Sequence, residues 1–217
     1  TLVIDPVPEI VWATYYGGGG GDVGFALAVM PGGDILLAGY TESPTAIATV
    51  GAHQATNGGN RDAFVAAFSS TGTRLWATYY GGTKATSGYA LAVTPGGDIV
   101  LAGETRSEDA IATAGAHQVT HGGGSWDAFV AMFTSTGTRL WGTYYGGSSP
   151  DYGRAVAVAP GGDIVLAGWT FSTTAIATAG AHQATKSGNE DAIVAVFTGT
   201  GTRLWGTYYG GSRPDYG

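Results

Sequence analysis

Three histidines recur at one place in a repeated sequence and are the first candidates for chemistry. Each stands in the block Gly-Ala-His-Gln, as His53, His117 and His182. Histidine acts as a general base or a metal ligand when partner groups converge on it. Equivalent positions in separate repeats lie far apart unless they face a common axis. We therefore expect these histidines to be packed in the scaffold and bonded to a loop carbonyl, and we place His121 in a variable surface loop.

Carboxylates recur at two positions in each repeat. Asp34, Asp98 and Asp163 follow Pro-Gly-Gly, where Asp completes a turn by accepting hydrogen bonds from backbone amides. Three others precede an apolar run and are expected to cap the loop before a strand: Asp62, Asp127 and Asp191. Calcium would need several converging oxygens, and the preceding residues (Arg61, Trp126 and Glu190) share no ligand pattern. We predict no bound metal and no cofactor.

The familiar catalytic motifs are absent from the sequence. There is no G-x-S-x-G, H-E-x-x-H or Walker loop, and no cysteine. The glycine-rich tracts precede no helix on which an anion could sit. No catalytic residue is predicted, and we expect the protein not to be an enzyme.

Positions that differ between the repeats are better candidates for specific binding. One column holds Tyr40, Glu104 and Trp169, and a second, two residues further on, holds Glu42, Arg106 and Phe171. Exposed aromatic side chains beside polar groups can contact a sugar or a protein partner. The candidate binding residues are Tyr40, Glu104, Arg106, Trp126, Trp169 and Phe171.

The scaffold that holds these residues is a repeat of about 65 residues. The block Trp-x-Thr-Tyr-Tyr-Gly-Gly begins at four structural tryptophans, Trp12, Trp76, Trp141 and Trp205. Two apolar runs flank Pro-Gly-Gly-Asp, which is typical of a hairpin. A third run, such as 127–133, turns back into the aromatic block, which is rich in strand-forming residues. Each repeat therefore predicts four antiparallel strands, an all-β unit of the β-propeller type that must stack on its neighbours.

These boundaries divide the chain as follows. Residues 1–11 form an extended lead-in, and 12–24 an orphan outer strand and its loop. The three complete blades are 25–80, 89–145 and 154–209, and 210–217 is a stub of the next repeat.

Five blocks in this order resemble a known repeat. They are Tyr-Gly-x-Ala-x-Ala-Val, Pro-Gly-Gly-Asp-Ile-Val-Leu-Ala-Gly, Gly-Ala-His-Gln, Asp-Ala-Phe-Val-Ala-x-Phe and Trp-x-Thr-Tyr-Tyr-Gly-Gly, within 12–217. Together they resemble the SBBP repeat, a seven-bladed β-propeller repeat of bacterial extracellular proteins, although histidine stands where that family more usually has an aromatic residue. The resemblance implies an extracellular or bacterial cell-surface protein, often part of a long multidomain chain.

Three blades do not close a ring, since propellers have about four to eight. We expect the chain to be a fragment of a larger propeller, to complete a ring with a second copy, or to stack head to tail with strand donation. The surplus strand at Trp12 is expected to pair with another molecule or a missing part of its own, and the chain not to be a free monomer.

Charge and composition narrow the partners further. A net charge of −7 argues against nucleic acid, and two lysines give no polybasic membrane patch. No apolar run is long enough to span a bilayer. The sequence therefore predicts a non-catalytic structural or interaction module that assembles through blade edges and loops. The alternative is a repeat lectin that binds glycans through its variable aromatic loops.

Overall fold

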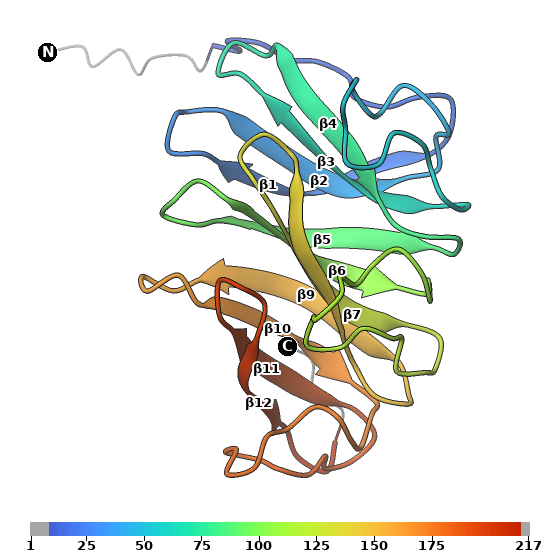
Figure 1. The fold of residues 1–217 in the computed structure, drawn as a ribbon, viewed down its shortest axis with the longest axis vertical. Coiled ribbons are helices and arrows are strands. Elements are labelled where there is room, and N and C mark those ends of the chain that lie inside the picture. Colours follow the sequence, from blue (N-terminus) through green and yellow to red (C-terminus); the bar gives the residue numbers. More distant parts are fainter. Residues whose placement is uncertain (1–8, 214–217) are drawn as a thin grey trace, which may run out of the picture.

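The computed structural model describes residues 9–213 and is entirely β in that range (Figure 1). Blade 1 consists of β1 (Asp22–Val29), β2 (Ile35–Thr41), β3 (Asp62–Phe68) and β4 (Arg74–Tyr80). Blade 2 consists of β5 (Thr86–Val93), β6 (Ile99–Thr105), β7 (Asp127–Phe133) and β8 (Arg139–Tyr145). Blade 3 consists of β9 (Asp151–Val158), β10 (Ile164–Thr170), β11 (Asp191–Phe197) and β12 (Arg203–Tyr209). Each blade is an antiparallel sheet with its strands in chain order, which confirms the predicted architecture.

The hairpin between the first two strands of a blade follows from the Pro-Gly-Gly-Asp block. Gly33 has a φ of 91°, a left-handed conformation that glycine adopts without a steric penalty. Its amide donates to the Met30 carbonyl at 2.8 Å and closes the turn. Gly97 and Gly162 have φ of 90° at the same place, so the repeated sequence builds the same turn three times.

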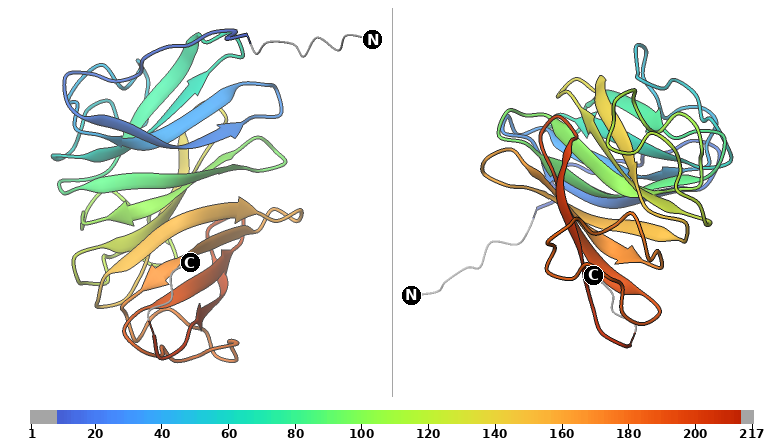
Figure 2. Two further views of the ribbon diagram at one scale, coloured as in Figure 1. Left: turned by 180° about the vertical axis from the view of Figure 1, so that it is seen from behind. Right: turned by 60° about the horizontal axis from the view of Figure 1, so that its bottom comes forward.

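The core lies between the blades. The sheets converge at their first strands, because β5 packs on β1, β2 and β3, and β9 packs on β5, β6 and β7 (Figure 2). One face of a blade carries small side chains such as Ala90 and Ala92, and the opposing face of the next blade carries larger ones such as Leu166 and Phe197. The small residues let neighbouring sheets approach closely. The three blades are therefore fanned in one direction.

A long loop joins the second and third strands of each blade and is anchored by a buried isoleucine. Ile47, Ile111 and Ile176 are completely buried. The alanine before each has a positive φ, between 63° and 73°, which is uncommon for a residue with a side chain. The cost of this backbone strain is about 1–3 kcal/mol per residue, and burial of an isoleucine offsets about 1.5–3 kcal/mol.

Two details differ from the sequence-based boundaries. The first strand of each blade begins three residues earlier than predicted, at Asp22, Thr86 and Asp151. The predicted outer strand at Trp12–Tyr16 is not a strand. Strand propensity is present there, but none of the described residues supplies a neighbouring strand to pair with it. The lead-in 1–11 and the stub 210–217 lie only partly within the described residues.

Candidate functional site

The two adjacent tyrosines of the aromatic block contact two different neighbours. The first packs within its own blade, where Tyr79 and Tyr144 are buried and donate to the carbonyls of Ser43 and Ser107 at 2.9 Å. The second packs on the following blade. Tyr80 donates to the Ile111 carbonyl at 2.8 Å and lies 5.3 Å from the Phe129 ring.

The tryptophan of the block also packs on the following blade. Trp76 donates its indole N–H to the Ser135 carbonyl at 2.9 Å, and Trp141 donates to Gly199 at 3.0 Å. Each indole lies over a turn glycine of the next blade, Gly137 or Gly201, where an added Cβ would come within 2.6 or 2.8 Å of the ring. Trp and the second Tyr thus form a repeated clasp between consecutive blades.

The N-terminal segment makes the same clasp on blade 1 without belonging to a blade. Trp12 donates to the Ser70 carbonyl at 2.9 Å, and Tyr16 donates to the Ile47 carbonyl at 3.1 Å. The Tyr16 ring lies 5.3 Å from Phe64, the distance that Tyr80 keeps from Phe129. Tyr15, in contrast, is fully exposed, because no strand among residues 9–213 packs beside it as the strands of a blade pack beside Tyr79 and Tyr144. We expected this segment to pair with another molecule or a missing part of its own, but its side chains find partners on blade 1 of the same chain.

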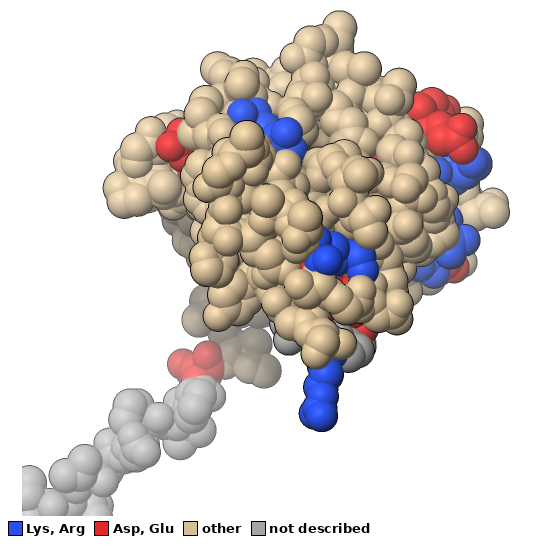
Figure 3. All heavy atoms as spheres, turned by 90° about the horizontal axis from the view of Figure 1, so that it is seen from below, with Lys and Arg blue, Asp and Glu red and all other residues tan. Residues whose placement is uncertain are grey.

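At the other end, the clasp residues of blade 3 contact no further blade among the described residues. Trp205 is 45% exposed and Tyr209 is 65% exposed, whereas Trp141 and Tyr145 are buried. Ala155 and Ala157 are exposed, whereas their counterparts Ala90 and Ala92 pack against blade 3. The surface seen from the blade 3 end is mostly uncharged (Figure 3). We call this surface the tail face and define it by one set of residues: Ala155, Ala157, Val165, Trp205 and Tyr209.

The opposite surface, on blade 1, is half covered. Its outer part, with Phe64 and Phe68, is covered by Tyr16. Its inner part is open, because Leu27 is 65% exposed and Val29 is 59% exposed. The equivalent residues of β5, Leu91 and Val93, pack against the preceding blade. We call this surface the head face, comprising Leu27, Val29, Phe64 and Phe68.

Three of the variable residues lie along the second strands, and two of them join a cluster centred on Arg154. The Arg154 guanidinium lies 4.1 Å from the Tyr89 ring and 4.5 Å from the Trp169 ring. It forms an ion pair of 2.7 Å with Glu104, whose side chain is almost buried. Tyr40 lies under the Arg61 guanidinium and is joined to the cluster through Phe25, whose ring is 5.7 Å from Tyr40. The charged and aromatic faces of this cluster are thus occupied by one another.

Sequence comparison of the repeats missed the centre of this cluster. Phe25, Tyr89 and Arg154 stand at the bulge in the first strand of each blade, and Phe25 stacks on Tyr89 at 4.8 Å. These three residues form a third position that varies between the repeats, and this variation is visible in the sequence. The bulge that brings their side chains together is not.

The remaining candidates lie near the loops at the strand ends. Arg106 and Trp126 line a hollow of about 450 Å³ together with Arg61 and Glu42. The Arg106 guanidinium covers the Trp126 ring at 4.3 Å, and Arg61 pairs with Glu42 at 2.9 Å. Phe171 borders the Arg154 cluster, because it packs against Tyr152, whose ring lies 5.1 Å from both the Trp169 ring and the Arg154 guanidinium. Four of the six candidate residues therefore lie in or beside the Arg154 cluster, and the other two, Arg106 and Trp126, lie together at the hollow.

The recurrent carboxylates close the loop before the third strand. In Asp62, Oδ2 accepts from the Gly58 amide at 2.7 Å and from the Gln54 side chain at 2.6 Å. Asp127 and Asp191 make equivalent bonds. Oδ1 of each is buried without a hydrogen-bond partner. Burial is the main cause that raises the pKa of Asp62 to about 6 and, helped by the charge of Asp151, the pKa of Asp127 to about 7.

The histidines differ from the sequence-based expectation. The His53 ring lies between Tyr80 of its own blade and Phe133 of the following blade. His117 lies in the same way between Tyr145 and Phe197. Neither ring forms the predicted hydrogen bond to a loop carbonyl within the described residues, because the rings point into the grooves between blades. His121 is not a surface residue: its side chain is 7% exposed, and its Nε2 lies 3.3 Å from the Thr105 carbonyl oxygen.

Other classes of site are not found in 9–213. No group of three or more His, Asp or Glu side chains there could hold a metal ion. Within the same range, no helix has the length and apolar character needed to cross a membrane.

Comparison with known proteins finds no family model that matches the chain and no curated protein that matches it. The resemblance to the SBBP repeat therefore stays a prediction.

Proposed function

We propose that this protein is a non-catalytic structural and interaction module that binds another blade of the same repeat type on its tail face. The blade would come from a second copy of the chain or from a longer parent chain. The extracellular or cell-surface setting is a further proposal, which rests on the resemblance alone.

The observation that carries the proposal is the unfilled clasp of blade 3, whose Trp205 and Tyr209 are exposed among the described residues. Every tail-type surface inside the molecule is covered by a head-type surface of the next blade, and only the last one is bare. Tyr15 lacks the blade it would belong to, and Tyr209 lacks the blade it would hold. Complementary surfaces at opposite ends give a head-to-tail contact, which closes a ring or extends an array.

The tail face is chemically suited to a blade and poorly suited to water. Burying a large apolar side chain stabilises a complex by about 1.5–3 kcal/mol, and Trp and Tyr are the residues that most often dominate interfaces. An exposed sheet face of this kind is otherwise an aggregation risk.

A second copy would meet competition at its own head face. Trp12 and Tyr16 already occupy the positions that Trp205 and Tyr209 of a neighbour would need. Docking of blade 1 therefore requires the segment 12–18 to move aside, which weakens self-association relative to the docking of a blade with a free head face.

Sedimentation velocity over a range of concentrations tests the proposal. Wild-type protein is expected to associate beyond 21.9 kDa, and Ala157→Arg to remain monomeric because a charge would be buried. Val50→Arg adds the same charge at a fully exposed loop position and should associate normally. Wild-type protein that stays monomeric at every concentration would contradict self-docking.

Glycan binding is the second candidate, and the hollow beside Trp126 is the observation that favours it. The aromatic rings of Tyr40, Trp126 and Trp169 are all covered by the chain's own arginines, so the support is confined to the space and the polar lining of that one hollow. A glycan array with Trp126→Ala as the control tests this function; a wild-type array without signal would exclude it for the sugars present.

A further inference from the structure

Two equivalent cavities open between consecutive blades, apart from the end faces. Cavity 1, between blades 1 and 2, has about 370 Å³, and cavity 2, between blades 2 and 3, has about 400 Å³. Both are lined by the same repeated side chains, a His, a Gln and an Arg, and by paired glycines. The residues are His53, Gln54 and Arg139 in cavity 1, and His117, Gln118 and Arg203 in cavity 2.

The arginine in each cavity is held by carbonyl groups and not by a carboxylate. Arg203 donates through one nitrogen to the carbonyls of Ala175 and Ile176 at 3.1 and 3.2 Å. Arg139 makes the same bonds to Ala110 and Ile111. Neither guanidinium forms an ion pair within the described residues. Each therefore presents a fixed positive charge with unused N–H donors.

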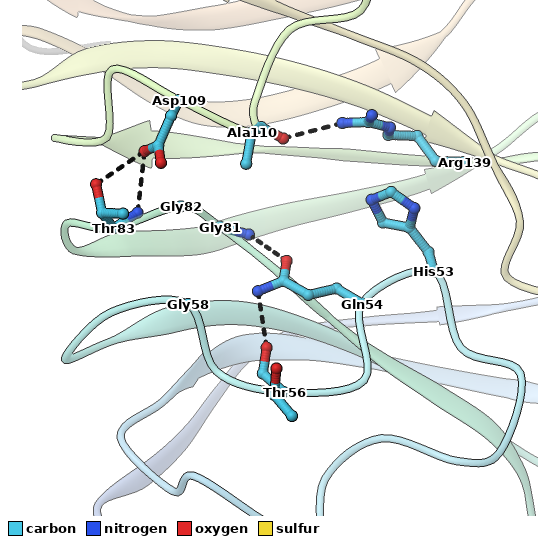
Figure 4. A pocket seen from close by; sticks show the side chains of 10 residues that line it. All are labelled: His53, Gln54, Thr56, Gly58, Gly81, Gly82, Thr83, Asp109, Ala110 and Arg139. Atoms are coloured by element: carbon cyan, nitrogen blue, oxygen red, sulfur yellow. Dashed lines mark hydrogen bonds between the residues drawn. The ribbon is translucent and has the colours of Figure 1, made fainter.

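The histidine faces the same space with both ring nitrogens unbonded within 9–213. Figure 4 shows His53 and Arg139 at one side of cavity 1, with Asp109 at the other. Burial and the positive charge of Arg139 lower the pKa of His53 to about 4, and Arg203 acts in the same way on His117. A neutral imidazole beside a guanidinium offers a donor and can take up a proton when an anion neutralises the arginine.

One repeat position differs in charge between the two cavities. Asp109 brings a carboxylate to cavity 1, where it accepts from the amide and hydroxyl of Thr83 at 3.0 Å. In cavity 2 the equivalent residues are Thr174 and Ser148, and no carboxylate lines the space. Two acids lie behind the wall of cavity 2: Asp151 accepts from the Gly147 amide at 2.7 Å and Asp127 accepts from the Gly122 amide at 2.6 Å. Burial is the main cause that raises the pKa of Asp151 to about 6 and that of Asp127 to about 7, so both are neutral at pH 4–5. Of the two cavities, only cavity 1 therefore has a carboxylate that lines the space itself.

We propose that cavity 2 binds a small oxyanion, a phosphate or carboxylate group, between Arg203 and His117, and that Asp109 excludes such an anion from cavity 1. The bound group accepts from the free N–H groups of Arg203, as guanidinium geometry favours. This binding is independent of whether a blade docks on the tail face, since both cavities are formed within the chain.

Histidine titration by NMR tests the site directly, because the chain has only four histidines. Inorganic phosphate and, separately, acetate are added at constant ionic strength set with chloride. Either anion, if bound, is expected to raise the pKa of His117 from about 4 to about 5 or above. His53 and His182 should titrate unchanged.

Two exchanged variants provide matched controls. Thr174→Asp installs in cavity 2 the acid that blade 2 already accommodates at Asp109, and should abolish the effect on His117. Asp109→Thr should transfer the effect to His53. The proposal is overturned if neither anion changes the titration of His117, if all four histidines respond alike, or if Thr174→Asp leaves the response intact while near-UV circular dichroism shows a native fold.

Discussion

Two tryptophans at equivalent repeat positions provide a matched test of the interblade clasp. Trp141 is 9% exposed, packs over Gly201 and donates to the Gly199 carbonyl at 3.0 Å. Trp205 is 45% exposed, and its indole N–H has no hydrogen-bond partner among the described residues. Their local sequences are the same, Arg-Leu-Trp-Gly-Thr-Tyr-Tyr, so propensity effects cancel in the comparison.

The expected cost differs because only one of the two tryptophans has a following blade. Trp141→Ala loses the buried ring, leaves a cavity and removes one hydrogen bond, which together destabilise the fold by about 3–5 kcal/mol. Trp205→Ala removes a ring that is already half in water, at a cost of about 1–2 kcal/mol.

Urea denaturation followed by far-UV circular dichroism measures both costs. The protein should be dilute enough to be monomeric, because association would add the tail-face contact to the stability of Trp205. Equal destabilisation by the two substitutions would refute the account of the clasp.

Three further predictions concern the termini and the buried acids. Trp12→Ala is expected to strengthen self-association several-fold, because it weakens the segment that competes for the head face; sedimentation equilibrium measures this, and weaker association would contradict it. Tyr16→Ala should destabilise the fold by about 2–4 kcal/mol in urea denaturation because Phe64 and Phe68 lose their cover, whereas Tyr15→Ala should change it by less than about 0.5 kcal/mol. The raised pKa of Asp127 means that its carboxyl group holds the proton more tightly in the folded state than in the unfolded state. The contribution of this proton to stability is complete below about pH 4 and is lost as the pH rises to about 7. Asp127→Asn should therefore gain stability relative to wild type between pH 5 and pH 8, and a constant stability difference would count against a raised pKa at Asp127.

Much of the fold could be predicted because each blade repeats the same turn residues and apolar runs. The apolar runs predict the third strand at 62–68, 127–133 and 191–197, and the structure has these bounds. The fourth strand was likewise placed correctly. Turn chemistry, apolar runs and repetition agreed with one another at these positions, and such agreement is what makes a fold readable from sequence.

The parts that could not be predicted depend on which neighbour is present. Residues 12–16 have the sequence of a strand, but a strand needs a hydrogen-bonded partner, and only their side chains find one. Arg154 is the first residue of the strand predicted for blade 3, and it becomes the centre of a cluster across two blades only through the bulge in that strand. The cavities beside His53 and His117 likewise need two blades, so one repeat does not reveal them.

The central claim is that a head face docks on a tail face, and mixing two charge variants tests it most directly. Leu27→Arg spoils the head face and leaves the tail face intact, whereas Ala157→Arg does the reverse. Each variant alone is expected to sediment as a monomer, and an equimolar mixture to form dimers through the one intact pair of faces. A mixture that remains monomeric while the wild type associates, or a single variant that still associates fully, would contradict head-to-tail docking.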